Sequence, residues 1–411
     1  METCTAEFAR LSAKMGGLDC DANPYITLTN PLSLQHWTMP VIELTLITGA
    51  IAALVHALRR RRVHGDASNL VIWLAGVFCL LLIEPIAYFP QWFGLENAMG
   101  LTFVHNQFTV QFLYDRLPLY IVAMYPFVGY AAWVLVQRAG IFKRYPAVVG
   151  ASCVTVVFFS LYEVVDMVGP QFRWWVWNEN LSTSVPTLAH VPYVNLQAFS
   201  IALPFAMALV TLWVSKQGQV RGWIAARNVV LVCLLVWPIL FLSSLPSLLL
   251  ALAGVPVETA RIVATWLLIS AAAIVTAIAF IASGRDRRGD PAGLDRDYFG
   301  PVFVGIYLGV ATVCWVAALP DYLSAKDGFT VTGARTGSVP CACTMATVGI
   351  ALTAGAYLRT TAPVSVVRRA GPSPAGRRTW SYRRRARTLA STPRPTLAAA
   401  VRPDCDTGSA R

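Results

Sequence analysis

Apolar runs of about 20 residues, separated by shorter polar segments, repeat along this sequence from position 38 onward. That length lets an α-helix cross the hydrocarbon core of a bilayer. The pattern therefore predicts an all-α, polytopic bundle of about nine transmembrane helices. The predicted spans are 38–58, 68–88, 117–137, 146–168, 193–214, 228–252, 262–283, 300–319 and 340–358.

The composition supports a membrane protein, since 56% of the residues are hydrophobic and only 13% are charged. Soluble globular chains are about 45–50% apolar and about 25% charged. This excludes a cytosolic enzyme, a disulfide-stapled secreted module and a disordered scaffold. The excess of Arg over Lys, 29 to 4, is typical of a G+C-rich bacterial genome, so we expect a bacterial plasma membrane.

The net charge of +12 comes mostly from the C-terminal segment, which carries twelve Arg and two Asp from Arg359 onward. We therefore divide the chain into an extracytoplasmic segment 1–37, a transmembrane helical domain 38–358 and an Arg/Pro-rich tail 359–411. The tail has too few apolar residues to order itself. It either binds anionic membrane lipids or simply orients the protein. Nucleic-acid binding is not expected.

Positive charge also predicts the orientation, because cationic loops stay on the cytoplasmic side. Fourteen Lys and Arg lie in alternate loops, around 59–62, 138–144, 216–227 and 285–296. The N-terminus and the other loops hold seven. We expect the N-terminus outside and the C-terminus in the cytoplasm. Termini on opposite sides of the membrane require an odd number of spans, in agreement with the nine predicted.

Four acidic side chains, and no basic ones, lie within the predicted spans: Glu43, Glu84, Glu163 and Asp166. A carboxylate costs about 2.5–3.5 kcal/mol at mid-span. All four lie toward the outer ends of their spans and indicate a site there. The alternative is that they are solvated or paired with Arg116 or Arg173, and for Glu43 the two readings are equally supported.

Glu163 and Asp166 are three positions apart, which places both carboxyl groups on one helix face and favours a shared proton. Aromatic residues follow the acids. Trp92 comes after Glu84, and Trp174, Trp175 and Trp177 come after Asp166. Aromatic residues also gather at ordinary membrane interfaces, but three Trp within four positions exceed that pattern.

The segment from Tyr162 to Ser200, with YEVVDMVGPQFRWWVWN followed by HVPYVNLQAFS, resembles the integral-membrane carotenoid hydratases. It is more distantly similar to the membrane carotenoid and terpenoid cyclases, and also to an uncharacterised group of polytopic actinobacterial proteins. The residues that match the hydratase pattern are Asp166, Trp175, Trp177, Val191, Pro192 and Asn195. The pattern is interrupted at Met167, which replaces a Pro, and at Ala198 and Phe199, which replace Gly-Trp.

The resemblance implies an enzyme that protonates a double bond of a carotenoid or other isoprenoid lipid and then hydrates or cyclises it. A neutral carboxylic acid can donate the proton, and indole faces can stabilise the carbocation. Asp166 would be the proton donor or water-orienting base, Glu163 would hold its proton, and Glu84 would be a second acid. The residues expected to bind the substrate or water are Trp92, Trp174, Trp175, Trp177 and Asn195.

Two other functions stay open: a proton-coupled transporter or carrier of a lipophilic molecule, and a non-catalytic membrane partner. A transporter favours acids near the midplane and in corresponding spans of two halves, unlike the acids here, which lie toward one side of the membrane.

No metal or cofactor motif is found. His105 and His190 could relay protons, but a lone loop His is more often solvated. Cys4 and Cys20 could form a disulfide. The oligomeric state and the substrate are not determined.

Overall fold

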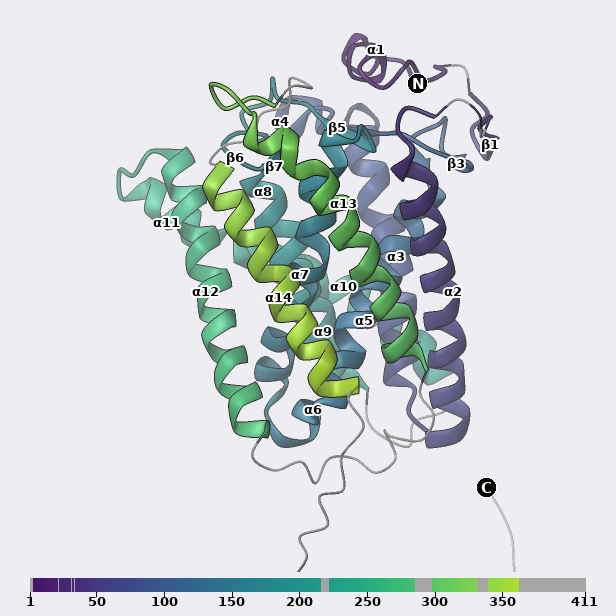
Figure 1. Ribbon diagram of the computed structural model, residues 1–411, viewed down its shortest axis with the longest axis vertical. Coiled ribbons are helices and arrows are strands. Elements are labelled where there is room, and N and C mark those ends of the chain that lie inside the picture. Colours follow the sequence, from purple (N-terminus) through teal and green to yellow (C-terminus); the bar gives the residue numbers. More distant parts are fainter. Residues whose placement is uncertain are drawn as a thin grey trace, which may run out of the picture. The chain divides into compact units, whose positions relative to one another are not determined.

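The computed structural model describes residues 3–20, 22–30, 32, 34–215, 222–284, 298–330 and 339–361. Its first compact unit, Met1–Ala362, is mostly helical (Figure 1). The tail from residue 362 and the cationic segments 216–221 and 285–297 lie outside the described residues.

Eight helical segments of the described chain are long and apolar enough to cross a membrane. Each coincides with one of the first eight predicted spans. A shorter apolar helix, Cys343–Leu358, lies where the ninth was predicted. The principal helices are α2 (Thr38–His64), α3 (Ser68–Tyr88), α5 (Leu119–Arg138), α7 (Ala147–Gln171), α9 (Leu203–Val214), α10 (Gly222–Ser243), α11 (Leu245–Leu252), α12 (Val257–Gly284), α13 (Gly305–Leu323) and α14 (Val339–Thr361).

Helix α2 extends six residues beyond its predicted end at position 58, through four consecutive Arg to His64. Hydropathy marks where the apolar run ends, whereas the helix continues because Arg is a good helix former. Cations in the last turn are also favourable at the negative end of the helix dipole. The helix then ends at Gly65, whose φ of 64° is left-handed.

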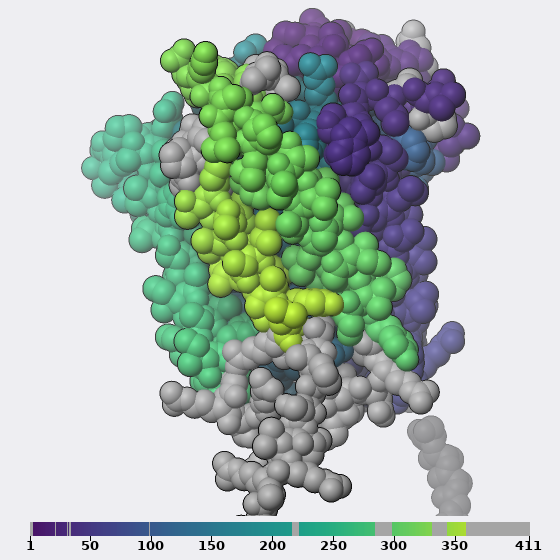
Figure 2. Space-filling model, in the orientation of Figure 1, coloured from purple at the N-terminus to yellow at the C-terminus, as the bar shows by residue number. Residues whose placement is uncertain are grey.

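The most buried long helices are α5 and α7, which pack against each other. Helix α7 also contacts α9, α12, α13 and α14, and on one face of the unit α13 lies between α2 and α14 (Figure 2). Helices α3 and α5 approach closely at Gly76. A Cβ atom there would lie 2.9 Å from the backbone Cα of Pro126, so the contact requires glycine.

A buried polar network joins α2, α3 and α5 near the end of the bundle that carries the short helix α6 (Ile141–Arg144). The Gln137 amide donates to Asp66, and the Asn69 amide donates to Gln137 and to the Tyr130 hydroxyl, each at 3.1 Å. The Tyr130 hydroxyl lies 2.6 Å from Nδ1 of His56. His56 therefore belongs to a hydrogen-bonded network.

The opposite end of the bundle carries short strands and helix α1 (Ala6–Ala13), as Figure 1 shows. The all-α prediction did not include these strands. Strand β2 pairs antiparallel with β5, so that Phe103 faces Trp177 and His105 faces Trp175. The strands at this end are β1 (Thr27–Leu28), β2 (Phe103–His105), β3 (Val110–Phe112), β4 (Leu117–Pro118), β5 (Trp175–Trp177), β6 (Thr187–Leu188) and β7 (Val191–Pro192).

Strands β2 and β5 form a ribbon with two different faces, because successive strand residues point to opposite sides. The odd-numbered residues line a pocket inside the bundle. Val104 and Val176 instead pack with Phe8 and Leu11 of α1. We call α1, β2 and β5 the roof. A disulfide between Cys4 and Cys20 closes the segment that carries α1, which confirms the pairing considered from the sequence.

Polar contacts also hold α1 in place. Glu7 accepts from the Asn178 amide and from the backbone N–H of Leu101. The Arg116 guanidinium lies over the Phe8 ring and donates to the carbonyl of Thr3. Burial lowers the pKa of Arg116 to about 9, although the nearby Asp115 opposes the change. Arg116 therefore secures the N-terminal segment.

Truncation of Phe8 is expected to loosen the roof. Phe8 is fully buried in the roof cluster, and a Phe→Ala change at such a site costs about 3–5 kcal/mol. We expect Phe8→Ala to speed proteolytic cleavage of the N-terminal segment in detergent-solubilised protein. Tyr25→Ala, at a site 80% exposed, is the matched control. Equal cleavage of the two variants would contradict the packing described for α1.

Candidate functional site

The four acids have different surroundings, and Glu43 stands apart from the others. Its carboxylate accepts from the backbone N–H groups of Phe108 and Thr109, each at 3.0 Å, and from the Thr109 hydroxyl. Glu43 thereby anchors the loop after β2 to helix α2. Glu43 is fully buried and accepts these hydrogen bonds, so it is neither solvated nor part of the outer pocket.

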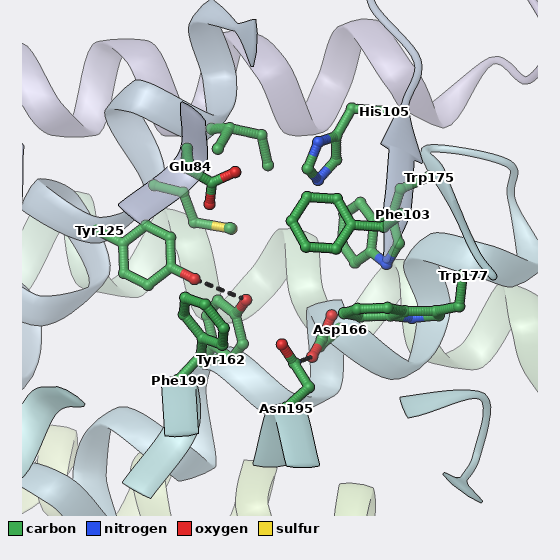
Figure 3. Close-up of a pocket in the computed structure, with 12 residues that line it drawn as sticks. Glu84, Phe103, His105, Tyr125, Tyr162, Asp166, Trp175, Trp177, Asn195 and Phe199 are labelled. Atoms are coloured by element: carbon green, nitrogen blue, oxygen red, sulfur yellow. Dashed lines mark hydrogen bonds between the residues drawn. The ribbon is translucent and has the colours of Figure 1, made fainter. Parts of the chain in front are cut away.

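A pocket, which we call the outer pocket, lies beneath the roof (Figure 3). It brings together five of the eight site residues expected from the sequence, namely Glu84, Asp166, Trp175, Trp177 and Asn195. The other lining residues are Phe103, His105, Ile121, Met124, Tyr125, Tyr162 and Phe199. None of the lining residues is Lys or Arg.

Asp166 reaches the outer pocket from α7, and Asn195 from the short helix α8 (Tyr193–Asn195). The Asn195 amide donates to Oδ2 of Asp166 at 2.9 Å, as Figure 3 shows. Within the described chain, no Lys or Arg forms an ion pair with any of the four acids. The pairing with Arg116 or Arg173 considered above is therefore absent from this part of the chain.

Glu163, one turn before Asp166 on α7, is buried but does not line the outer pocket. The Ser200 hydroxyl is close to its carboxyl group. Neither carboxyl oxygen has a partner in hydrogen-bond geometry among the described residues. Glu163 is therefore a buried acid that lies close to the outer pocket but does not line it.

Glu84 lines a different wall of the outer pocket, on α3. Tyr88 follows one turn later and lies against the Glu84 carboxyl group. The Tyr88 hydroxyl also lies 2.9 Å from Nδ1 of His105. Oε2 of Glu84 has no hydrogen-bond partner among the described residues, which leaves one oxygen available to a guest.

The side chain of His105 is buried on the pocket side of the roof, so the expectation of a solvated loop histidine is wrong. The reason is that its segment forms strand β2 and turns the imidazole toward the pocket. Burial lowers the pKa of His105 to about 3, which keeps the ring neutral at physiological pH. His190 is also buried, stacked on Tyr322, but it does not line the outer pocket.

Acid should destabilise the protein through His105. An unfolded His titrates near pH 6.5, whereas the pKa of buried His105 is about 3. Between these values the unfolded chain binds more protons, so stability falls as the pH falls through this window. The variant His105→Gln should lose less stability than the wild type between pH 7 and pH 4.5, measured as the shift of the thermal unfolding midpoint. Identical shifts in both proteins would refute the assignment.

The four predicted tryptophans divide into two pairs. Trp175 and Trp177 line the outer pocket, and their indole N–H groups have no partner among the described residues. Trp174 lies outside the lining and donates its indole N–H to the Thr38 hydroxyl at 3.0 Å. Trp92 stacks on Phe89, with ring centroids 3.9 Å apart, and also lies outside.

Sequence reasoning missed several aromatic residues of the outer pocket. The hydroxyl groups of Tyr125 and Tyr162 lie 3.3 Å apart on one side of it (Figure 3). Tyr162 could have been found, because it stands four residues before Asp166 and shares its helix face. Phe199 was singled out only as a departure from the hydratase pattern, where it replaces a Trp. It lies in the π-helix η2 (Leu196–Ala202), a distortion often found at functional sites.

No protein-family model, curated protein or solved structure matches this chain. The site is therefore interpreted from its own geometry. Its enclosed aromatic wall carries two carboxyl groups and no cation, which suits proton transfer to an apolar guest. Within the described chain, no group of three His, Cys, Asp or Glu side chains is placed to hold a metal ion.

Proposed function

We propose that this protein is an integral membrane enzyme that protonates a double bond of a carotenoid or other isoprenoid lipid, as a hydratase or cyclase. The observation that carries the proposal is the meeting of Asp166 and Glu84 in one aromatic pocket without a cation. Ionic partners would hold such acids as carboxylates. Here Asp166 has an uncharged amide partner instead.

In the proposed reaction, the Asp166 carboxyl group transfers its proton to one carbon of the double bond. The π electrons form the new C–H bond and leave a carbocation on the adjacent carbon. Water then adds and loses a proton, which gives an alcohol, or a second double bond of the same lipid adds and a proton is lost, which gives a ring. The released proton restores the Asp166 carboxyl group, so the acid is regenerated.

The neighbouring residues support these steps. The Asn195 amide orients the Asp166 carboxyl group. Buried Glu163, one turn away, supplies a second protonatable group. The indole rings of Trp175 and Trp177 border the pocket, where a cation over a desolvated ring gains about 2 kcal/mol. Oε2 of Glu84 can accept a hydrogen bond from water or hold the released proton.

The distribution of polar residues favours an enzyme over a proton-coupled carrier. A carrier uses ionisable groups near the midplane, in corresponding parts of two halves. Here Glu84 and Asp166 lie under the roof, and the network around Asn69 lies toward the other end of the bundle. The α7 residues that line the neighbouring cavity, Phe158 and Val154, are apolar and offer no ionisable group to a proton path.

We further propose nine spans in a bacterial plasma membrane, with the N-terminus outside and α14 as the last span. The roof and the Arg-rich end of α2 lie at opposite ends of the bundle (Figure 1), which supports this assignment. A cysteine introduced at exposed Glu96 or Asn180 should react with an impermeant thiol reagent on intact cells. A cysteine at exposed His64 should react only after permeabilisation. The unsubstituted chain is the background control, and reversed labelling would refute the orientation.

The reaction is tested by comparing lipids. Pigments and prenyl lipids are extracted from isoprenoid-producing bacterial cells that express the wild type, the double variant Asp166→Asn/Glu84→Gln, or no protein. We expect a hydrated or cyclised isoprenoid in the wild type alone. Matched membrane levels of the two proteins are verified by immunoblot. Identical lipid profiles in all three strains would refute the proposed activity.

A further inference from the structure

A second cavity lies next to the outer pocket, and we call it the inner cavity. Tyr125 lines both spaces. The other lining residues of the inner cavity are Ile72, Gly129, Val154, Phe158, Leu203, Pro204 and Met207. Apart from the Tyr125 hydroxyl, the lining side chains carry no hydrogen-bonding group, so the space disfavours water and suits hydrocarbon.

The same helices form both spaces, and the inner cavity continues the outer pocket along them. On α5, Gly129 follows Tyr125 by four residues, which is about one turn. On α7, Phe158 and Val154 precede Asp166 by eight and twelve residues. At 1.5 Å per residue, the inner cavity therefore extends to about 18 Å along the helix from Asp166.

A partition of aromatic rings separates the two spaces. The Tyr125 and Tyr162 hydroxyl groups meet at 3.3 Å, and the Tyr162 ring stacks on Phe158 at 5.1 Å. Phe199 closes the partition against Tyr125, with ring centroids 6.4 Å apart. The partition consists of side chains, so a change of rotamer can join the two spaces without moving a helix.

We propose that the inner cavity is a measuring site for a linear isoprenoid chain, which passes the partition and rests its hydrocarbon end between α5, α7 and α9. The proposal builds on the proposed function. The depth of the inner cavity then determines which double bond, counted from the buried end of the chain, lies beside Asp166. The preferred substrate is an acyclic isoprenoid that reacts near one end.

Gly129 offers a direct way to shorten the inner cavity. A Cβ atom at Gly129 would lie 4.0 Å from the Phe158 ring, so a side chain there has room to extend into the space. Gly129→Leu should therefore fill the inner cavity and leave the residues of the outer pocket unchanged. Met207→Ala should enlarge the inner cavity. Gly309→Leu, at a glycine with open space around it, is the matched control.

The test uses a farnesol analogue with a diazirine at its hydrocarbon end, photolysed in membranes that contain the full protein. Peptide mass spectrometry locates the adduct. In the wild type and in Asp166→Asn we expect adducts at Val154, Leu203 or Met207. In Gly129→Leu this adduct should fall about tenfold, because several buried methylene contacts are lost. The Gly309→Leu control should label like the wild type.

A longer polyene probe tests for an increase in the inner-cavity adduct, opposite to the decrease expected for Gly129→Leu. With it, Met207→Ala should increase the inner-cavity adduct, a gain that a misfolded variant cannot produce. Unchanged labelling in both Gly129→Leu and Met207→Ala, or adducts only on lipid-facing residues, would overturn the measuring site. An inner-cavity adduct together with unchanged lipid profiles in expressing cells would instead overturn the proposed reaction and leave the binding site intact.

Discussion

Asp166→Asn is expected to lower product formation by about 10²–10⁴-fold, the usual contribution of a general acid. An amide cannot supply the proton that converts the double bond into a carbocation. The variant should still fold, because the oxygen of an Asn side chain can accept the hydrogen bond that the Asn195 amide now donates to Asp166. The measurement is the rate of product formation in membranes supplied with the isoprenoid.

Glu43→Gln is the matched control for Asp166→Asn, because Glu43 is a buried intramembrane acid outside the outer pocket. It should keep nearly the wild-type rate per folded molecule. Any loss should appear in the thermal unfolding midpoint, since its contacts are with the loop at Phe108 and Thr109. Equal loss of rate in Asp166→Asn and Glu43→Gln would show that acid burial in general, and not the site, governs activity.

Gly169→Ala is expected to deform the outer pocket from behind one of its tryptophans. A Cβ atom at Gly169 on α7 would lie 2.3 Å from Cζ2 and 2.4 Å from Cη2 of Trp175. The indole must shift, although β5 pairs its backbone with His105. Such overpacking costs about 1–3 kcal/mol, and the displaced ring should enter the pocket and lower activity. Thermal unfolding and product formation are measured on the same preparation.

The control for Gly169→Ala is Gly309→Ala, since a Cβ atom at Gly309 on α13 meets nothing within 4 Å. That change should leave activity unchanged and stabilise the helix by about 1 kcal/mol, because Ala is the better helix former. A wild-type unfolding midpoint and rate in Gly169→Ala would contradict the tight contact between α7 and Trp175.

The helical spans were predictable because each depends on a local property, an apolar run long enough for a bilayer. Helix α2 differs from its prediction only at the end, where Arg59–Arg62 extend the helix beyond the apolar run. The strands were not predictable in the same way. Strand β2 has three residues, and its partner β5 lies about seventy positions later, so no local periodicity indicates their pairing.

The sequence predicted which types of residue form the site better than it predicted which individual residues line the outer pocket. Asp166, Glu84, Asn195, Trp175 and Trp177 do share one pocket. Trp174 and Trp175 are adjacent, yet only Trp175 lines the pocket, because Trp174 precedes β5 and donates its indole N–H to Thr38 of α2. The sequence does not state which of the two faces inward. That depends on the register of β5 against β2.

The sequence by itself determined that this chain is a helical membrane protein with rare buried acids and a cluster of tryptophans, because hydrophobicity and charge are carried by each residue. Only the tertiary structure decided which acids share a space. It assigned Glu43 to a loop anchor, set Glu84 across from α7 in the outer pocket and buried His105 under the roof. Those outcomes depend on contacts between residues far apart in the chain, and such contacts form only when the helices pack.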